Sequence, residues 1–153
     1  MKIFVITICN KNDNYLNDII KKYSDLIDKF YKITFIDINF KQKKVKKNLY
    51  EKEYKKAISL IKPQSYVVAL DEQGKNQNSY KFSEKIEYVS ENFVNLYFII
   101  GGPDGLTEYI KKEASEIMSL SSLTFPHHLA KVILSEQIYR SICIMNNHPY
   151  HRH

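Results

Sequence analysis

Cysteine is scarce in this sequence of 153 residues, and long apolar runs are missing. The two cysteines, Cys9 and Cys143, lie far apart at no spacing typical of metal ligands, so we expect free, buried thiols. No apolar run approaches the length that crosses a bilayer, so we expect no membrane partner. The opening residues MKIFVITIC resemble a signal peptide, but polar residues follow at once without a small-residue cleavage site. We therefore expect a buried first strand and a cytoplasmic protein.

Internal repeats, low-complexity linkers and breaks in composition are also lacking, so we predict a single domain over residues 1–153. The hydrophobic fraction of 44% is that of a globular protein with a real core. The net charge of +6 and the pI of about 9.1 permit a polyanionic partner such as RNA. Five lysines fall within KQKKVKK, residues 41–47. That run is either a solvated loop or a patch that follows phosphates.

Apolar patterns of strand and helix type alternate along the chain. Short runs rich in β-branched residues predict strands over 2–8, 32–38, 66–70 and 95–100, with a short strand beginning at 117. Helical spacing predicts helices over 13–29, 46–61, 83–92, 106–114 and 127–145, with Ser83 as an N-cap. This alternation predicts an α/β fold with a mainly parallel sheet and helices on both faces.

Three loops follow predicted strands, at 70–75, 101–105 and 120–126. In parallel sheets, ligands bind beyond the carboxyl ends of the strands. Glycines in GGPDG either let a ligand approach the backbone or form a simple strand-to-helix turn. The run SLSSLTFPHH mixes apolar side chains with small hydroxyls, which suits an adenine ring, or it ends a strand and caps the next helix. The residues alone leave these alternatives open.

The sequence ends in NNHPYHRH, which is consistent with a loose metal-binding tail, a remnant of cloning or half of an active site. His148, His151 and His153 have no carboxylate or cysteine nearby at ligand spacing, so we expect no metal. We interpret His127 and His128, which open the last helix, as structural rather than catalytic.

Four motifs together carry a resemblance that none carries alone. ALDEQGK, FIIGGPDG, LSSLTFPHHLAKVILSEQIYR and NHPYHR occur in the order and spacing of the small α/β-knot (SPOUT-class) methyltransferases. In particular, the chain resembles the family that methylates N3 of a pseudouridine in large-subunit (23S) ribosomal RNA. The resemblance spans essentially the whole chain. It implies a deep trefoil knot in the C-terminal part, a homodimer, and S-adenosyl-L-methionine as the methyl donor.

The resemblance also implies site residues. Carried over one by one, the cofactor contacts fall on Leu70, Gly101, Gly102, Leu120, Ser121, Ser122, Leu123, Thr124 and Phe125. The tail is implied to pack near the donor of a dimer partner, with His148, Tyr150 and Arg152 as catalytic residues. Histidine titrates in the useful range, tyrosine can stack on or hydrogen-bond a splayed base, and arginine can pair with a phosphate. We assign no role to His153.

The last helix carries more apolar residues than one side of a sheet requires. We expect it to expose five of them and to form an isologous dimer: Leu129, Val132, Ile133, Tyr139 and Ile142. Ribosomal RNA, within a large subunit or ribosome, is the implied substrate. Two alternatives stay open, namely a knotted methyltransferase that acts on transfer RNA and a non-enzymatic ribosome-binding module of the same fold.

Overall fold

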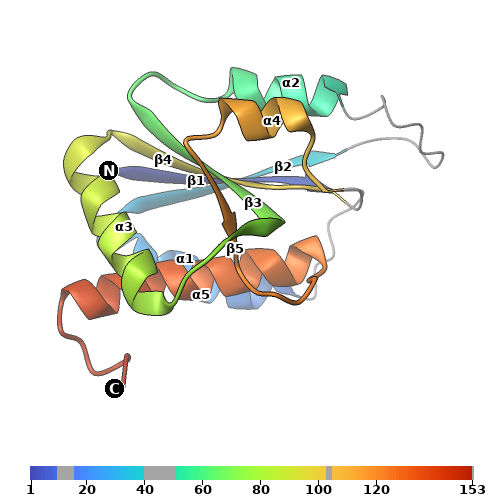
Figure 1. Cartoon of the computed structure of the whole chain (residues 1–153). Coiled ribbons are helices and arrows are strands. Elements are labelled where there is room, and N and C mark those ends of the chain that lie inside the picture. Colours follow the sequence, from blue (N-terminus) through green and yellow to red (C-terminus); the bar gives the residue numbers. More distant parts are fainter. Residues whose placement is uncertain (10–15, 40–50, 103–104, 153) are drawn as a thin grey trace.

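A computed structural model of the chain describes residues 1–9, 16–39, 51–102 and 105–152 (Figure 1). Strands and helices alternate as the sequence predicts. The elements are β1 (Lys2–Cys9), α1 (Asn17–Ile27), β2 (Lys32–Asn39), α2 (Glu51–Ser59), β3 (Ser65–Asn76), α3 (Ser79–Asn92), β4 (Asn95–Ile100), α4 (Glu108–Glu113), β5 (Glu116–Ser119) and α5 (His127–Met145). The lysine-rich run at 41–47 and His153 lie outside the described residues.

The five strands form one sheet in the order β2-β1-β4-β3-β5, and every neighbouring pair is parallel. The prediction of a parallel α/β fold is therefore confirmed. Because all strands run the same way, their carboxyl ends meet at one edge of the sheet. The strands contain apolar runs because both faces of a parallel sheet are covered, and every residue of β4 is buried.

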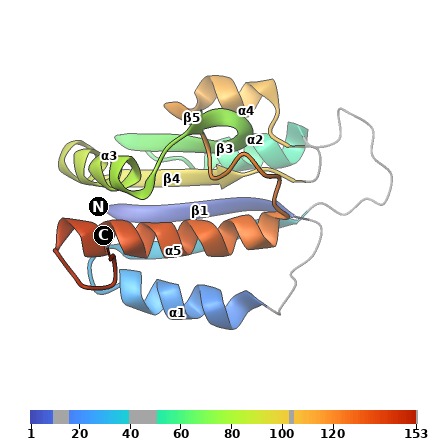
Figure 2. The same ribbon diagram turned by 60° about the horizontal axis from the view of Figure 1, so that its bottom comes forward.

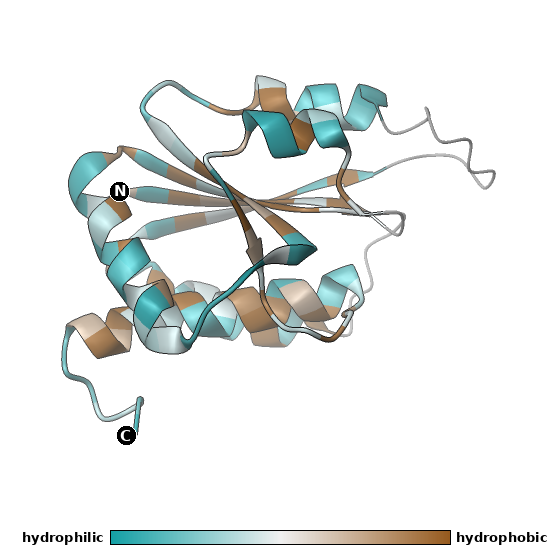
Figure 3. Ribbon diagram, viewed as in Figure 1, coloured by the Kyte–Doolittle hydropathy of each residue, from teal (hydrophilic) through white to brown (hydrophobic). Residues whose placement is uncertain are grey.

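Helices cover the two faces unequally (Figure 2). Helices α1, α3 and α5 pack on one face, where Val5 and Phe98 meet residues such as Leu134. Helices α2 and α4 cover the other face, where Ile6 and Ile99 belong to a second cluster. Successive residues of a strand point to opposite faces, so one apolar strand serves both clusters. Apolar residues accordingly run along the strands (Figure 3).

Helix α5 is enclosed by α1, α3 and the sheet, which is why it is apolar on most sides. The prediction that Ile142 is exposed is wrong, because this side chain faces the core and is only 1% accessible. Leu129 is exposed, whereas Val132, Ile133 and Tyr139 are half-buried. The outward strip of α5 is therefore narrower than the sequence suggests.

The prediction of Ser83 as an N-cap is also wrong. Helix α3 begins four residues earlier, and its N-cap is Asn78, whose side chain accepts a hydrogen bond from the Lys81 N–H at 3.0 Å. Ser83 is buried and donates to the Ser141 carbonyl oxygen at 3.1 Å, so it joins α3 to α5. Among the described helices, none is long and apolar enough to cross a membrane.

Candidate active site

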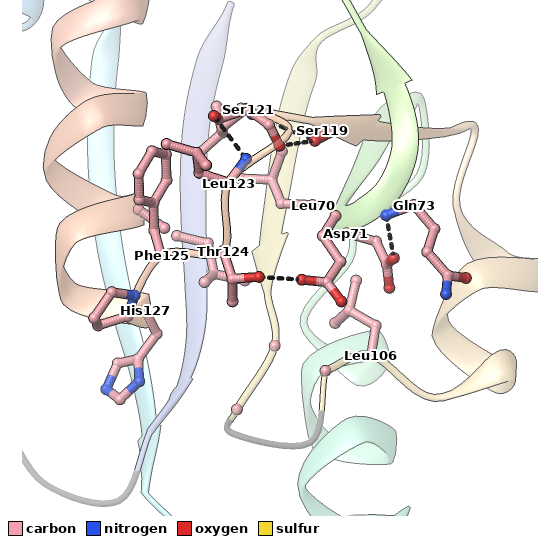
Figure 4. A pocket seen from close by; sticks show the side chains of 18 of the residues that line it. Leu70, Asp71, Gln73, Leu106, Ser119, Ser121, Leu123, Thr124, Phe125 and His127 are labelled. Carbon is pink, nitrogen blue, oxygen red and sulfur yellow. Dashed lines mark hydrogen bonds between the residues drawn. The ribbon is translucent and has the colours of Figure 1, made fainter.

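A pocket of about 800 Å³ opens at the carboxyl edge of the sheet, beyond β3, β4 and β5 (Figure 4). The three loops singled out in the sequence come together here. Its walls consist of Leu70, Asp71, Glu72, Gln73, Ile100, Gly101, Gly102, Gly105, Leu106, Lys111, Ser119, Leu120, Ser121, Leu123, Thr124, Phe125, Pro126, His127 and Ala130. Eight of the nine residues predicted to contact a cofactor are in this set.

Ser122 is the exception among the predicted residues. Its hydroxyl accepts a hydrogen bond from the Asn76 side-chain amide at 2.9 Å, which ties the loop to the end of β3. Its neighbours shape the pocket through short turns. The Ser119 hydroxyl donates to the Ser121 carbonyl at 2.6 Å, and the Ser121 hydroxyl accepts from the Leu123 N–H at 3.0 Å. Leu123 lines the pocket and is 70% exposed, so its apolar side chain is accessible to a ligand.

The stretch predicted as a polar loop, 71–75, instead belongs to β3 and contains a bulge. Met118 of β5 is opposite Leu70 and again opposite Lys75, so the residues between them lie outside the regular ladder. The Asp71 carboxylate accepts a hydrogen bond from the Gln73 N–H at 2.9 Å, which holds the bulge in shape. This bulge turns Asp71, Glu72 and Gln73 to the pocket, and sequence periodicity gave no sign of it.

Gly74 closes the bulge against β5. A Cβ atom at this position would lie 2.5 Å from the Met118 carbonyl carbon, closer than any real contact. We expect Gly74→Ala to lower the free energy of unfolding by about 1–3 kcal/mol, because backbone must move to admit the methyl group. Thermal denaturation of Gly74→Ala beside Lys75→Ala, an exposed neighbour, measures the effect. Equal melting temperatures for the two variants would contradict this account of the bulge.

Two carboxylates and one ammonium group line the pocket. The Asp71 carboxylate lies 3.0 Å from the Lys111 ammonium, and both side chains are largely buried. The hydrogen bond from Lys111 to Asp71 is the main cause that raises the pKa of Lys111. Glu72 accepts a hydrogen bond from the Thr124 hydroxyl at 2.7 Å, which joins the β3 bulge to the connection at 120–126. The fixed charges of this wall sum to a negative value, which favours a positively charged ligand.

The sequence did not predict several of the residues that line the pocket. Asp71 and Glu72 directly follow the apolar part of β3, and the change from apolar to polar residues there was a usable signal. Lys111 and Ala130 come from helices and reach the pocket only through the fold. His127, interpreted as structural, lies on the pocket wall at the first turn of α5.

The C-terminal tail lies at the opposite end of α5 (Figures 1 and 2). Helix α5 has 19 residues, and at 1.5 Å per residue its two ends are about 28 Å apart. His127 marks the pocket end, and His148 follows the other end. The predicted cofactor residues and the predicted catalytic residues of one chain are therefore not brought together.

The tail leaves α5 through a defined turn. Asn147 has a φ of +51°, its N–H donates to the Ile144 carbonyl at 3.1 Å, and the His148 N–H donates to the Cys143 carbonyl at 2.8 Å. This is a Schellman motif, with asparagine at the left-handed position. Beyond it, His148 and Arg152 are exposed, whereas Tyr150 and His151 are half-buried.

Metal-ligating side chains do not cluster within the described residues, where no group of three or more His, Cys, Asp or Glu could hold an ion. Both cysteines are free and buried, as predicted. Burial is the main cause that raises the pKa of each thiol, so both stay protonated and unreactive at neutral pH.

A family model described as "Predicted SPOUT methyltransferase" matches residues 1–151. The chain is 36% identical to the ribosomal RNA large subunit methyltransferase H of Acholeplasma laidlawii, over 99% of this chain and 100% of that protein. It is 37% identical to the protein of the same name from Pseudothermotoga lettingae, over 99% of each chain.

Solved structures share the fold at lower sequence identity. A probable methylase family protein from Haemophilus influenzae superposes with a TM-score of 0.61 and 11% identity, over 99% of this chain and 70% of that one. The SpoU methyltransferase AviRb from Streptomyces viridochromogenes, solved in complex with AdoMet, gives a TM-score of 0.51 and 11% identity, over 92% and 58%.

Proposed function

Since this chain belongs to the SPOUT methyltransferase family, we propose that it transfers a methyl group from S-adenosylmethionine to large-subunit ribosomal RNA. The observation that carries the proposal is the pocket at the sheet edge, whose lining includes eight of the nine residues that the motifs predict. Full-length relatives named for this activity support the substrate class. The resemblance in the motifs extends the proposal to N3 of a pseudouridine. Such a substrate places the protein in the cytoplasm, where ribosomes are.

The pocket suits S-adenosylmethionine in size and chemistry. Its volume lies in the range of small-molecule sites, and Leu70, Leu106 and Ala130 offer apolar surface to an adenine ring. The carboxylates of Asp71 and Glu72 complement a ligand that carries a sulfonium and an ammonium group. When bound, this cofactor supplies an electrophilic methyl group. The residues of the pocket orient it and exclude water from it.

The tail supplies the groups for the RNA side of the reaction. Displacement at the methyl carbon needs a nucleophile in line with the leaving sulfur, and an imino nitrogen reacts only after it loses its proton. The His148 imidazole can orient the base through a hydrogen bond, and the exposed Arg152 guanidinium can pair with a phosphate. Because the tail is a helix length from its own pocket, it serves the pocket of a second subunit.

The partner subunit is a second copy of this chain. We expect the outward strip of α5, with Leu129, Val132 and Ile133, to form an isologous interface that brings each tail to the other pocket. Light scattering at micromolar concentration should report a dimer. A charged residue on the strip, Ile133→Glu, should shift the protein toward monomer, whereas Tyr88→Glu on the exposed side of α3 should not. A wild-type monomer would contradict both the dimer and the shared site.

A trefoil knot belongs to the same proposal. Strand β5 forms one edge of the sheet, and helix α5, which follows it, packs on β1 and β4 near the middle of the sheet. The chain therefore crosses back over earlier strands. The connection at 120–126 and the segments flanking 101–105 share one pocket. We infer that the connection at 120–126 threads through an earlier part of the chain, a rare exception among protein folds.

Mass mapping of large-subunit RNA from cells with and without the gene tests the proposed function. A methyl group lost on deletion and restored by the purified protein with S-adenosylmethionine is the expected result. Calorimetry with the cofactor alone separates the alternatives. Absence of heat favours the non-enzymatic module, and binding with methylation of transfer RNA instead favours the other substrate class.

A further inference from the structure

We propose that Tyr150 is a positioning residue, held by Glu136 and Tyr23, and that it fixes the tail so that His148 and Arg152 face the RNA. The inference rests on the proposed function and deepens it, because it divides the tail into residues that anchor and residues that meet the substrate. The sequence alone placed Tyr150 among the groups that touch the base. The contacts of its phenol favour another role.

The phenol of Tyr150 is engaged within its own subunit. Its hydroxyl donates to a Glu136 carboxylate oxygen at 3.0 Å and lies 3.3 Å from the Tyr23 hydroxyl. A phenol has one proton, so donation to Glu136 leaves the Tyr23 hydroxyl as the donor to Tyr150. Burial, and then the hydrogen bonds with Tyr23 and Glu136, raise the pKa of the Tyr150 phenol, which keeps it a donor at neutral pH. A base could use this hydroxyl only by displacing both partners.

The ring of Tyr150 is held as well. The Arg140 guanidinium lies over its face, 4.9 Å from the centroid, and the Tyr139 ring meets it edge-on, also at 4.9 Å. Arg140 is itself fixed, because its Nε donates to Glu136 at 2.9 Å. We call Tyr23, Glu136, Tyr139 and Arg140 the tail socket. Tyr150 therefore has hydrogen-bond partners for its hydroxyl and packing partners for its ring, contacts that a frayed terminus lacks.

His151 forms a second anchor point. Its Nδ1 lies 3.2 Å from an Arg140 nitrogen, and its ring meets Tyr80 of α3 edge-on at 4.9 Å. Three helices thus contribute to holding the tail, namely α1 through Tyr23, α3 through Tyr80 and α5 through Glu136. Anchoring by several elements fixes orientation far better than a single contact does.

The residues on either side of the anchors are the exposed ones. The side chains of His148 and Arg152 are exposed. The Tyr150 N–H donates to His148 Nδ1 at 3.2 Å, so the position of the imidazole depends on Tyr150. Because Nδ1 accepts this hydrogen bond, a neutral imidazole carries its proton on Nε2, which can donate a hydrogen bond to the substrate base. Loss of the socket therefore misplaces His148 without removing it.

A double-mutant cycle on the two tyrosines tests the inference, since each change removes only a hydroxyl. Tyr23→Phe and Tyr150→Phe should each lower kcat about five- to tenfold, because each variant loses one or two hydrogen bonds. The KM for RNA and the cofactor affinity should stay unchanged. The double variant should be no worse than the poorer single one. Glu136→Gln, which keeps an acceptor oxygen, should retain more turnover than Glu136→Leu. Tyr88→Phe on α3 is the matched control and should keep full activity.

Additive losses, or a defect confined to Tyr150→Phe, would overturn the inference and return Tyr150 to the substrate side. Amide hydrogen exchange gives a readout that needs no activity. Exchange over residues 148–152 should speed up in Tyr23→Phe and Tyr150→Phe but not in Tyr88→Phe. Unchanged exchange in both variants refutes the socket, whether or not the wild-type protein methylates RNA. A wild-type protein that neither binds the cofactor nor methylates RNA, with exchange altered as expected, refutes the proposed function instead.

Discussion

Removal of residues 148–153 is expected to abolish methyl transfer while cofactor binding and the dimer survive. The pocket is a helix length away from these residues, so its affinity for the cofactor should change less than twofold. The fold should lose little stability, although more than a frayed end would cost, because Tyr150 and His151 are half-buried. Single-turnover methylation and calorimetry on the truncated protein measure the two effects. Full activity without the tail would refute the assignment of its residues.

A mixed dimer reveals which pocket the tail serves. One subunit lacks residues 148–153, and the other carries Gly101→Val and an intact tail. If the tail acts across the dimer, the truncated subunit has a good pocket and receives the tail of its partner. The mixed dimer, purified through two different affinity tags, should then show about half the wild-type activity, because one of two equivalent sites is complete. No recovery in that dimer would mean that each tail serves its own subunit.

Gly101→Val is expected to eliminate cofactor binding in a folded protein. A Cβ at Gly101 would lie 2.7 Å from the Gly105 carbonyl carbon. A valine side chain would therefore clash with the backbone and would also fill space that the cofactor needs. The turn cannot open freely, since the Gly105 N–H donates to the Gly102 carbonyl at 2.9 Å and the Tyr54 hydroxyl of α2 donates to the Gly105 carbonyl at 2.5 Å. Any widening must break these bonds, and the wall of the pocket shifts with them.

Calorimetry should find cofactor affinity at least about 100-fold weaker in Gly101→Val, the effect of losing about 2.7 kcal/mol of binding free energy. Tyr88→Phe is the control, because this exposed side chain of α3 is not part of the pocket lining. That variant should bind within twofold of wild type. Circular dichroism and the melting temperature establish that both variants fold. Unchanged affinity in a folded Gly101→Val protein would remove Gly101 from the site.

The sequence predicted the fold well where the physics is local. Buried parallel strands produce short runs of β-branched residues, so β1, β2 and β4 lie within a residue or two of their expected bounds. The bounds of α5 were predicted correctly, since Pro126 opens the helix and its apolar pattern ends near Met145. Helix ends were less accurate elsewhere, because a cap depends on which side chain the backbone turns toward.

The parts that escaped prediction depend on contacts between distant segments. The bulge in β3 exists because β5 pairs on both sides of it, and Gly74 matters only through the backbone of Met118. The sequence placed the tail near an active site but gave no sign of its direction, which the left-handed turn at Asn147 fixes. The sequence does not indicate a partner for the Tyr150 phenol. Only the packing of α1 against α5 brings the Tyr23 hydroxyl next to it.

The position of α5 has a consequence for how the protein is made. This helix comes last in the sequence, yet it packs on β1 and α1, which come first, and against α3. Contacts that join the two ends of a chain are slow to form during folding. While the ribosome is still translating, the apolar face of β1 and β4 that α5 covers stays open to water and to other chains. A chain that lacks α5 is therefore expected to leave this apolar face exposed and to aggregate.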